Sequence, residues 1–297
     1  MQPIPGRYNT DGPWFKGNTH IHTTFSDGAK DYATVAGMYA ERGYQFLFIT
    51  DHGRVADIED VPGLPLLALN GVEIDGVDET GASYHAVGLG YSEALPKGAL
   101  WGGIPFGGQV SHLQRAGGLV VLAHPYWTGN SVEDALRHGF DGVEVYNHIC
   151  HYLNGKSSGA YHWDRMLERN PRTLGFSADD AHMNGDQPWD GAFIVISASS
   201  LNRENVMTSL RKGNFYATQG PRFESIHVDK HHITVRTSPV GAIRLVDNTS
   251  WGARAYAGEG RTLTEAQFEV VGPHAYLRVE IEDLQGRMAW TNAVLEP

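Results

Sequence analysis

Residues 16–52 contain the feature that most constrains the fold: histidines and aspartates placed where two neighbouring strands are expected to end. The stretch reads K-G-N-T-H-I-H-T-T-F-S-D-G and continues, after a helix-length segment, with Q-F-L-F-I-T-D-H. His20 and His22 are two positions apart, so a strand would point both imidazoles to one face of a sheet. The cluster Ser26-Asp27-Gly28 is typical of a turn, which would bring Asp27 back toward the end of that strand.

The following residues predict a βαβ unit. Residues 31–43 predict a helix, because apolar residues form a stripe and Gly43 stands where a helix commonly ends. Residues 45–50 predict a buried parallel strand that leads into His52. His52 would then lie at the carboxyl end of the strand, where α/β sheets and barrels place their functional residues. A lone H-x-H pair is weak evidence in a chain with 15 histidines, but this ordered set predicts a metal site.

Further strand-like runs end in residues that bind metals. Residues 66–74 end near Glu73, a carboxylate that is costly to bury unless it meets a cation or a hydrogen-bond donor. Residues 83–91, 118–124 and 174–177 carry or precede the remaining candidates, which are His85, His124, Asp179, Asp180 and His182. The residues alone leave the choice between Asp179 and Asp180 open. Glu144 and Asn147, in the strand predicted over 141–147, are candidates for groups that orient the imidazoles.

Composition limits the class of protein. The 297 residues, 41% of them hydrophobic, suffice for one large and one small domain. The net charge of −11, with no run of Lys or Arg, argues against a nucleic-acid coat protein. No signal-peptide pattern and no membrane-length apolar run is visible, so we expect a cytoplasmic location and no membrane contact. Cys150, the single cysteine, is expected to be a buried, inert thiol.

Two later segments complete the organisation. The glycine-rich run in residues 92–109 matches no phosphate-binding loop motif, so we expect a mobile rim from which Trp101 or Phe106 contacts substrate. After Gly220 the sequence alternates between apolar and polar residues with turns between, which predicts antiparallel strands. We therefore expect a domain at 1–220 and a small β-sandwich-like domain at 221–297, whose histidines lie at the surface.

Taken in order, the motifs resemble the PHP (polymerase and histidinol phosphatase) family of metal-dependent phosphoesterases. The resemblance covers about residues 14–220 and rests on the opening block, N-G-V-E ending at Glu73, His85, A-H-P around His124, and D-A-H at 180–182. The opening block and Y-A-T-Q-G-P at 216–221 are most similar to the CehA/McbA-type branch. The resemblance implies an α/β fold, a distorted (β/α)7 TIM-like barrel, and it favours Asp180 over Asp179.

The resemblance also implies three metal ions. The ligands would be His20, His22, Asp27, His52, Glu73, His85, His124, Asp180 and His182. Imidazoles and carboxylates without a thiolate suit two to three divalent ions such as Zn, Mn or Fe. By proximity and resemblance, the first ion takes His20, His22 and Asp180, the second His85 and His124, and the third Asp27, His52 and His182. Glu73 would bridge the first two ions.

The predicted activity is hydrolysis of a small phosphomonoester or nucleotide. Glu73 and Asp180 would help hold a water between two ions, which becomes acidic enough to attack phosphorus as hydroxide. Arg54 is a candidate for orienting the phosphate, although a solvated loop position fits it equally well. A metal-filled pocket in an acidic protein favours a small anionic substrate. Two alternatives stay open: a hydrolase of carboxylic or carbamate esters, and a non-catalytic metal-binding module.

Overall fold

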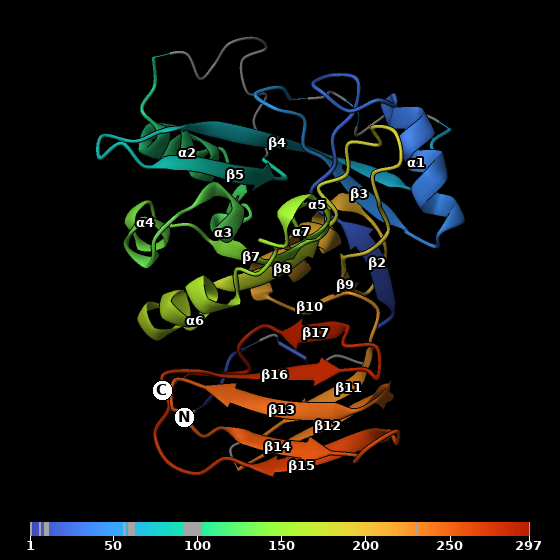
Figure 1. The fold of residues 1–297 in the computed structure, drawn as a ribbon, viewed down its shortest axis with the longest axis vertical. Helices are drawn as coiled ribbons and strands as arrows, with labels where there is room; N and C mark the ends of the chain where they lie inside the picture. The colour runs from blue at the N-terminus through green and yellow to red at the C-terminus, as the bar shows by residue number, and fades with distance from the viewer. Residues whose placement is uncertain are drawn as a thin grey trace.

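The chain forms a barrel-like α/β body with a smaller β domain stacked against it in the computed structural model (Figure 1). The structure describes residues 2–5, 7–8, 12–55, 58, 63–91, 103–229 and 231–296. Trp101 and most of the predicted rim lie outside the described residues. Phe106 is buried and stacks on Tyr84 at 4.7 Å between ring centroids, so it belongs to the core and not to a substrate rim.

The body is built on strands β2 to β10. They are β2 (Trp14–Asn18), β3 (Phe46–Ile49), β4 (Leu67–Val77), β5 (Ser83–Leu89), β6 (Leu119–Leu122), β7 (Gly142–Asn147), β8 (Leu174–Ala178), β9 (Phe193–Ser197) and β10 (Phe215–Thr218). Strands β2, β3 and β4 pair in parallel, as do β6, β7 and β8. Strands β5, β9 and β10 pair antiparallel with their neighbours, which distorts the βα repeat. The predicted α/β class is confirmed.

The chain segments just beyond β2 and β8 contact each other. Ile21 forms a parallel bridge with Ala181. The N–H of His22 donates to the carbonyl of Ala181 at 3.0 Å, and the N–H of Asp180 donates to the carbonyl of His20 at 2.9 Å. These contacts bring the residues that follow β2 against those that follow β8, although about 160 positions separate them in the chain.

Helices follow several of the strands. They are α1 (Tyr32–Glu41), α2 (Phe106–Arg115), α3 (Pro125–Thr128), α4 (Val132–Arg137), α5 (His148–Asn154), α6 (Ala160–Arg169) and α7 (Arg203–Lys212). The Asp31 carboxylate caps α1 by accepting from the N–H of Thr34, and Gly43 follows with φ +77°, so the predicted helix is confirmed. In the described ranges, no helix is long and apolar enough to cross a membrane.

The continuous apolar runs of the parallel strands are buried on both faces. Phe46 and Phe48 of β3 pack in one core cluster with side chains of α7 such as Leu210. The alternate residues Leu47 and Ile49 pack in another cluster with side chains of α1 such as Tyr39. This two-sided burial explains why the strand carries no polar alternation.

The β domain contains two antiparallel sheets. Strands β11 (Phe223–Val228), β12 (His232–Val240) and β15 (Leu263–Glu269) form one, and β13 (Ala242–Asp247), β14 (Ala253–Tyr256), β16 (Leu277–Glu282), β17 (Met288–Thr291), β18 (Leu295–Glu296) and β1 (Gln2–Pro3) belong to the other. The second sheet continues into the barrel, because β17 pairs with β10. The small antiparallel domain is confirmed, whereas its boundary at residue 221 stays a prediction; β1 pairs with β18, which places the two termini together (Figure 1).

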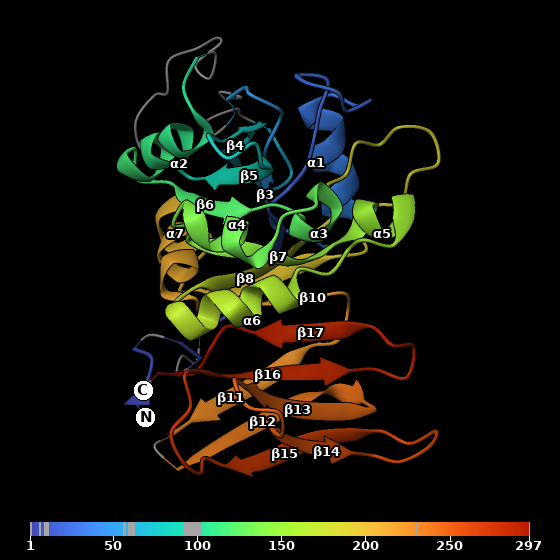
Figure 2. The ribbon, with the colours of Figure 1, turned by 60° about the vertical axis from the view of Figure 1, so that its left-hand side comes forward.

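A buried arginine joins the two parts. Arg278 of β16 is 1% exposed and donates to the Asp164 carboxylate of α6 at 2.8 Å, while its guanidinium lies 4.7 Å from the centre of the Trp163 ring. The hydroxyl of Tyr276 donates to the same carboxylate at 2.8 Å. Helix α6 lies on the side of the barrel that faces the β domain (Figure 2), so these contacts fix the β domain to the barrel.

A buried carboxylate, Asp78, ties α4 to the β4–β5 turn. Asp78 accepts from the hydroxyl of Thr80 at 2.6 Å, from Arg137 Nη1 at 2.9 Å and from the Tyr84 hydroxyl at 3.1 Å. Burial alone would raise the pKa of Asp78, but these hydrogen bonds outweigh it and hold the pKa well below its usual range.

We expect Asp78→Asn to destabilise the protein by about 2 kcal/mol or more at pH 7, because Arg137 loses its buried partner. A carboxyl with a depressed pKa stabilises fully above its unfolded-state pKa of about 4, and that contribution is lost as the pH falls through the folded-state pKa. Urea unfolding at pH 7 and at pH 3 should therefore show a smaller difference from wild type at pH 3. The exposed Asp186→Asn is the control, and an unchanged difference would contradict the assignment.

Candidate metal centre

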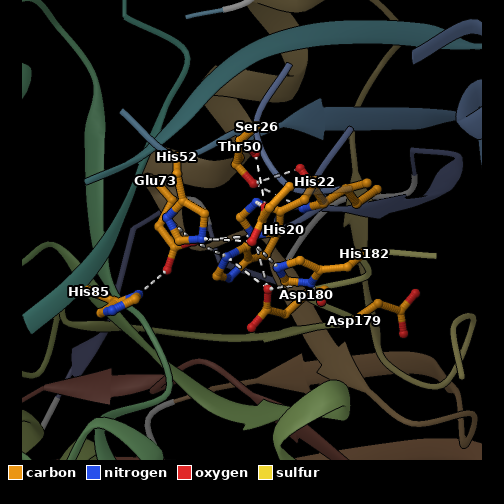
Figure 3. A network of polar contacts seen from close by, with 12 residues as sticks. His20, His22, Ser26, Thr50, His52, Glu73, His85, Asp179, Asp180 and His182 are labelled. Carbon is orange, nitrogen blue, oxygen red and sulfur yellow. Dashed lines mark hydrogen bonds and ion pairs between the residues drawn. The ribbon is translucent and has the colours of Figure 1, made fainter. Parts of the chain in front are cut away.

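The residues proposed as ligands meet at one end of the barrel (Figure 3). His20 and His22 follow β2, His52 follows β3, His124 follows β6, and Asp180 and His182 follow β8. Glu73 and His85 lie inside β4 and β5. Because β5 runs antiparallel to β4, its beginning lies at the same edge of the sheet as the ends of the parallel strands. This topology explains why His85 lies near the beginning of its strand and still reaches the centre.

Two of these residues have strained backbones. His124 has φ +26° and Asp180 has φ +54°, in a region that residues other than glycine rarely adopt. Each stands two positions after the last residue of a strand. Such strain persists only where the surrounding structure enforces it, and it concentrates at functional sites. The two turns therefore mark this end of the barrel as the site.

The first group of donors contains His20, His22, Glu73 and Asp180, all buried. Nε2 of His20 lies 3.2 Å from Glu73 Oε2 and 3.3 Å from Asp180 Oδ1. Nε2 of His22 lies 3.2 Å and 3.0 Å from the same two oxygens. Two imidazole nitrogens and two carboxylate oxygens thus surround one point, with the members expected for the first ion and for its bridging glutamate.

A second group forms around the other oxygen of Glu73. Glu73 Oε1 lies 2.8 Å from His85 Nδ1 and 3.4 Å from His124 Nε2. His52 Nδ1 also faces this carboxylate, at 3.3 Å from Oε2. Because Oε1 and Oε2 face different imidazoles, Glu73 has the geometry of a bridging carboxylate. His52 belongs to this group and also to the third one. In the sequence-based prediction it belonged to the third group only.

The third group contains His22, Asp27, His52 and His182. The Asp27 carboxylate lies 3.3 Å from His182 Nε2, 3.8 Å from His52 Nε2 and 3.5 Å from His22 Nδ1. His22 therefore presents one ring nitrogen to the first group and the other to the third. The sequence does not predict that His22 takes part in two groups, because residue spacing does not say where the second nitrogen of an imidazole points.

Glu144 and Asn147 of β7 hold the first group in place. Glu144 Oε1 lies 2.7 Å from His20 Nδ1, and Oε2 accepts from the backbone N–H of His124 at 2.9 Å. The Asn147 amide donates to Glu144 at 2.8 Å and to Asp180 Oδ2 at 3.1 Å. A carboxylate on Nδ1 leaves Nε2 of His20 available as a ligand atom and fixes the ring. This is the orienting role expected for both residues.

The electrostatics of the first group call for a cation. Within the ranges that the structure describes, His20 Nε2, both ring nitrogens of His22, and Asp180 Oδ1 are buried without a hydrogen-bond partner. Burial lowers the pKa of His22, but Asp180 and Glu73 outweigh it and raise that pKa to about 9. Burial would raise the pKa of Glu73, yet the charge of His20 and the other imidazoles close to this carboxylate hold it well below its usual range. Divalent metal ions satisfy such buried donors, so the residues fit them.

Asp51 and Asp179 support the site without joining it. Asp51 accepts from the N–H groups of Thr23 and Ser26 at 2.8 and 3.0 Å, which fixes the turn that carries Asp27. Asp179 points away from the centre (Figure 3). Its carboxylate instead accepts hydrogen bonds from side chains of Asn18 and Tyr39 and from the N–H groups of residues 190–192.

Arg54 contacts the same turn. Its Nη1 donates to the carbonyl of Phe25 at 2.9 Å, and the side chain is not among those that line the cavity beside the centre. Its proposed role in orienting a phosphate stays a prediction. Asp75, at 3.6 Å from His52 Nδ1, lies at the edge of the centre.

The cavity beside the centre has a volume of about 210 Å³. One side consists of Asp27, His52, Glu73, His85, His124, Asp180 and His182, and the other of Trp127, Ile149, Cys150, Leu153 and Gln187. Burial raises the pKa of the Cys150 thiol far above its usual range, so it is the inert thiol that was expected. The places of Ile149, Leu153 and Gln187 in this wall were not predicted, because a helix as short as α5 has too few residues to show a periodic pattern.

A distorted α/β barrel with this mixed imidazole and carboxylate centre defines the class: the fold of the PHP-like metal-dependent phosphoesterases. Among solved structures, a two-domain protein from Bacteroides vulgatus "containing predicted PHP-like metal-dependent phosphoesterase" matches with a TM-score of 0.51 and 14% identity, over 99% of this chain and 98% of that one. The likeness includes both domains. The chain therefore has the PHP-like fold that the motifs implied, whereas the CehA/McbA-type branch stays a prediction.

Two curated relatives match over less than a third of the chain. Over 82 residues the chain is 33% identical to the phosphoribosyl 1,2-cyclic phosphate 1,2-diphosphodiesterase of Eggerthella lenta, covering 26% of this chain and 31% of the relative. Over 85 residues it is 29% identical to the DNA polymerase/3'-5' exonuclease PolX of Bacillus subtilis, covering 29% and 15%. The chain thus spans less than a third of either relative, and no family model matches it.

Proposed function

We propose that the chain is a metal-dependent phosphoesterase that acts on a small phosphoester, with the phosphomonoester or nucleotide expected from the sequence as candidate substrates. The observation that carries this proposal is the first group of donors: four of its buried atoms have no hydrogen-bond partner among the described residues, and two of its members, Glu73 and Asp180, line the cavity. The names of the two curated relatives, one a phosphodiesterase and one an exonuclease, support hydrolysis at phosphorus.

The protein's own residues would contribute by holding the metal ligands in position. Bound divalent ions would supply Lewis acidity and a more acidic water. Glu73 would hold its two oxygens toward different imidazoles, and Glu144 and Asn147 would keep His20 and Asp180 from turning away. Cys150 keeps its proton, so no thiolate nucleophile stands at the cavity.

Hydrolysis of carboxylic or carbamate esters is a second candidate, and one observation favours it. Among the described residues, none of those that line the cavity is a lysine or an arginine. A phosphoester would therefore depend on the metal ions alone for charge compensation, whereas a neutral ester would need less. A non-catalytic metal-binding module is the weakest alternative, because the donors face an open cavity and not a closed structural site.

We expect purified protein to carry two to three divalent ions per chain, because the three groups of donors share Glu73, His22 and His52. Elemental analysis of protein prepared with Zn, Mn or Fe measures this number, and chelation should abolish hydrolysis of a panel of phosphomonoesters, phosphodiesters, nucleotides and aryl esters. A His231→Ala variant, altered in the β domain, is the matched control. One ion or fewer per chain under metal-replete conditions contradicts the assignment.

A further inference from the structure

The side of the cavity opposite the ligands is apolar. Trp127 of α3 and Ile149 and Leu153 of α5 line it, and the two short helices lie close to each other at the barrel mouth (Figure 2). Trp127 is 37% exposed and Leu153 is 50% exposed. Single exposed apolar residues are ordinary, but here several line one cavity beside a polar centre. The wall is therefore available to an apolar part of a ligand.

Trp127 is held in a defined position relative to the centre. Its ring lies edge-on to the His124 ring at 5.1 Å and to the His85 ring at 5.9 Å between centroids. A group bound against Trp127 is therefore a neighbour of two proposed ligands. Aromatic side chains favour stacked or edge-to-face contacts with other aromatic rings, so the geometry suits a ring directly attached to the reacting ester.

A single polar group interrupts the apolar wall. Oε1 of Gln187 is buried and has no hydrogen-bond partner in the described part of the chain. A buried acceptor without a partner is costly, and a ligand that donates a hydrogen bond would relieve that cost. Of the described residues on this side of the cavity, none has a charged or hydroxyl group.

The cavity has room for an aromatic ring. A cavity of roughly 150 Å³ holds a benzene molecule, so about 210 Å³ accommodates one aromatic ring beside a reacting group. The ribose hydroxyls of a nucleoside would need polar partners, and the apolar residues of this wall do not supply them.

We infer that the substrate is the ester of a compact aromatic alcohol, whose ring packs on Trp127 and Leu153 and whose hydrogen-bond donor meets Gln187. This inference rests on the proposed phosphoesterase function and narrows its substrate class. In the reaction, water adds its oxygen to phosphorus, the bond between phosphorus and the aryl oxygen breaks, and that oxygen leaves with a proton as the free phenol. Trp127 and Gln187 are thus specificity-determining residues.

The test compares kcat/KM for phenyl phosphate, 4-hydroxyphenyl phosphate, ethyl phosphate, ribose 5-phosphate and AMP in the metal-loaded protein. Trp127→Ala should lower the value for both aryl phosphates about tenfold or more and leave that for ethyl phosphate within about twofold. Gln187→Leu should lower kcat/KM for 4-hydroxyphenyl phosphate more than kcat/KM for phenyl phosphate. Tyr126→Ala is the matched control, since Tyr126 precedes Trp127 in α3, is 50% exposed and does not line the cavity.

A second measurement does not depend on turnover. Calorimetry should show that 4-hydroxyphenol binds the wild-type protein and the Tyr126→Ala variant but binds Trp127→Ala at least about tenfold more weakly, with thermal unfolding confirming that each variant is folded. If AMP or ribose 5-phosphate is the better substrate, or if Trp127→Ala affects all substrates equally, the inference is overturned while phosphoesterase activity stands. If phenyl acetate or phenyl methylcarbamate is cleaved with the same dependence on Trp127 and no phosphate ester is, the aryl site stands and the phosphoesterase proposal fails.

Discussion

Replacing Glu73 by Gln should lower kcat by a hundredfold to a thousandfold or more while the protein stays folded. Glu73 Oε2 lies near His20 and His22, whereas Oε1 lies near His85. Glutamine keeps the shape but removes the negative charge and replaces one oxygen by an amide nitrogen, which is a poor metal ligand. The first and second groups of donors would then lose the carboxylate that they share. Loss of one electrostatic contact in an active site typically lowers kcat by about a hundredfold to a thousandfold.

The measurement combines steady-state kinetics, metal content and thermal unfolding. Glu79→Gln is the matched control, because Glu79 is exposed in the turn after β4, six positions further along the chain. We expect wild-type activity and metal content for the control. A near-normal kcat and metal content for Glu73→Gln would show that Glu73 is an ordinary buried carboxylate, and the bridging role would pass to Asp75, which lies 3.6 Å from His52.

Much of the centre could be predicted because its donors occupy strand ends. His52 and His124 each follow a run of four buried apolar residues, and such runs are visible in a sequence. Strand ends at one edge of a sheet meet in space, so the proximity of these histidines follows from local patterns and the topology of an α/β barrel. The same reasoning identified Glu73 through the cost of burying a carboxylate.

Other features depend on contacts between distant segments and have no local signal. Glu144 contacts His20, which lies 124 positions away in the chain. The sequence predicted that Glu144 orients an imidazole, but it did not indicate which one. The pairing of β1 with β18 joins the two ends of the chain through segments of two residues each. The apolar wall around Trp127 and Leu153 arises from two short helices that become neighbours only in the folded barrel.

The pair Asp179 and Asp180 shows a further limit. Residue type cannot separate two adjacent aspartates, and the choice of Asp180 came from the resemblance. In the structure the positive φ of Asp180 turns the backbone so that the two carboxylates serve different purposes. Asp179 is 0% exposed and accepts from Asn18, Tyr39 and three backbone N–H groups, whereas Asp180 faces His20 and His22.

The two aspartates should therefore fail in different ways when each is replaced by asparagine. In Asp179→Asn, the new amide NH₂ must face N–H donors that previously met a carboxylate oxygen, so we expect a loss of about 3 kcal/mol or more in the free energy of unfolding. In Asp180→Asn, the remaining oxygen can still accept from Asn147, so stability should change little while metal content and activity fall sharply. Urea unfolding and elemental analysis of the two variants give both quantities. A stable, metal-free Asp179→Asn together with an unstable, metal-loaded Asp180→Asn would reverse the assignment, and the ligand would then be the carboxylate that the structure places among the backbone donors.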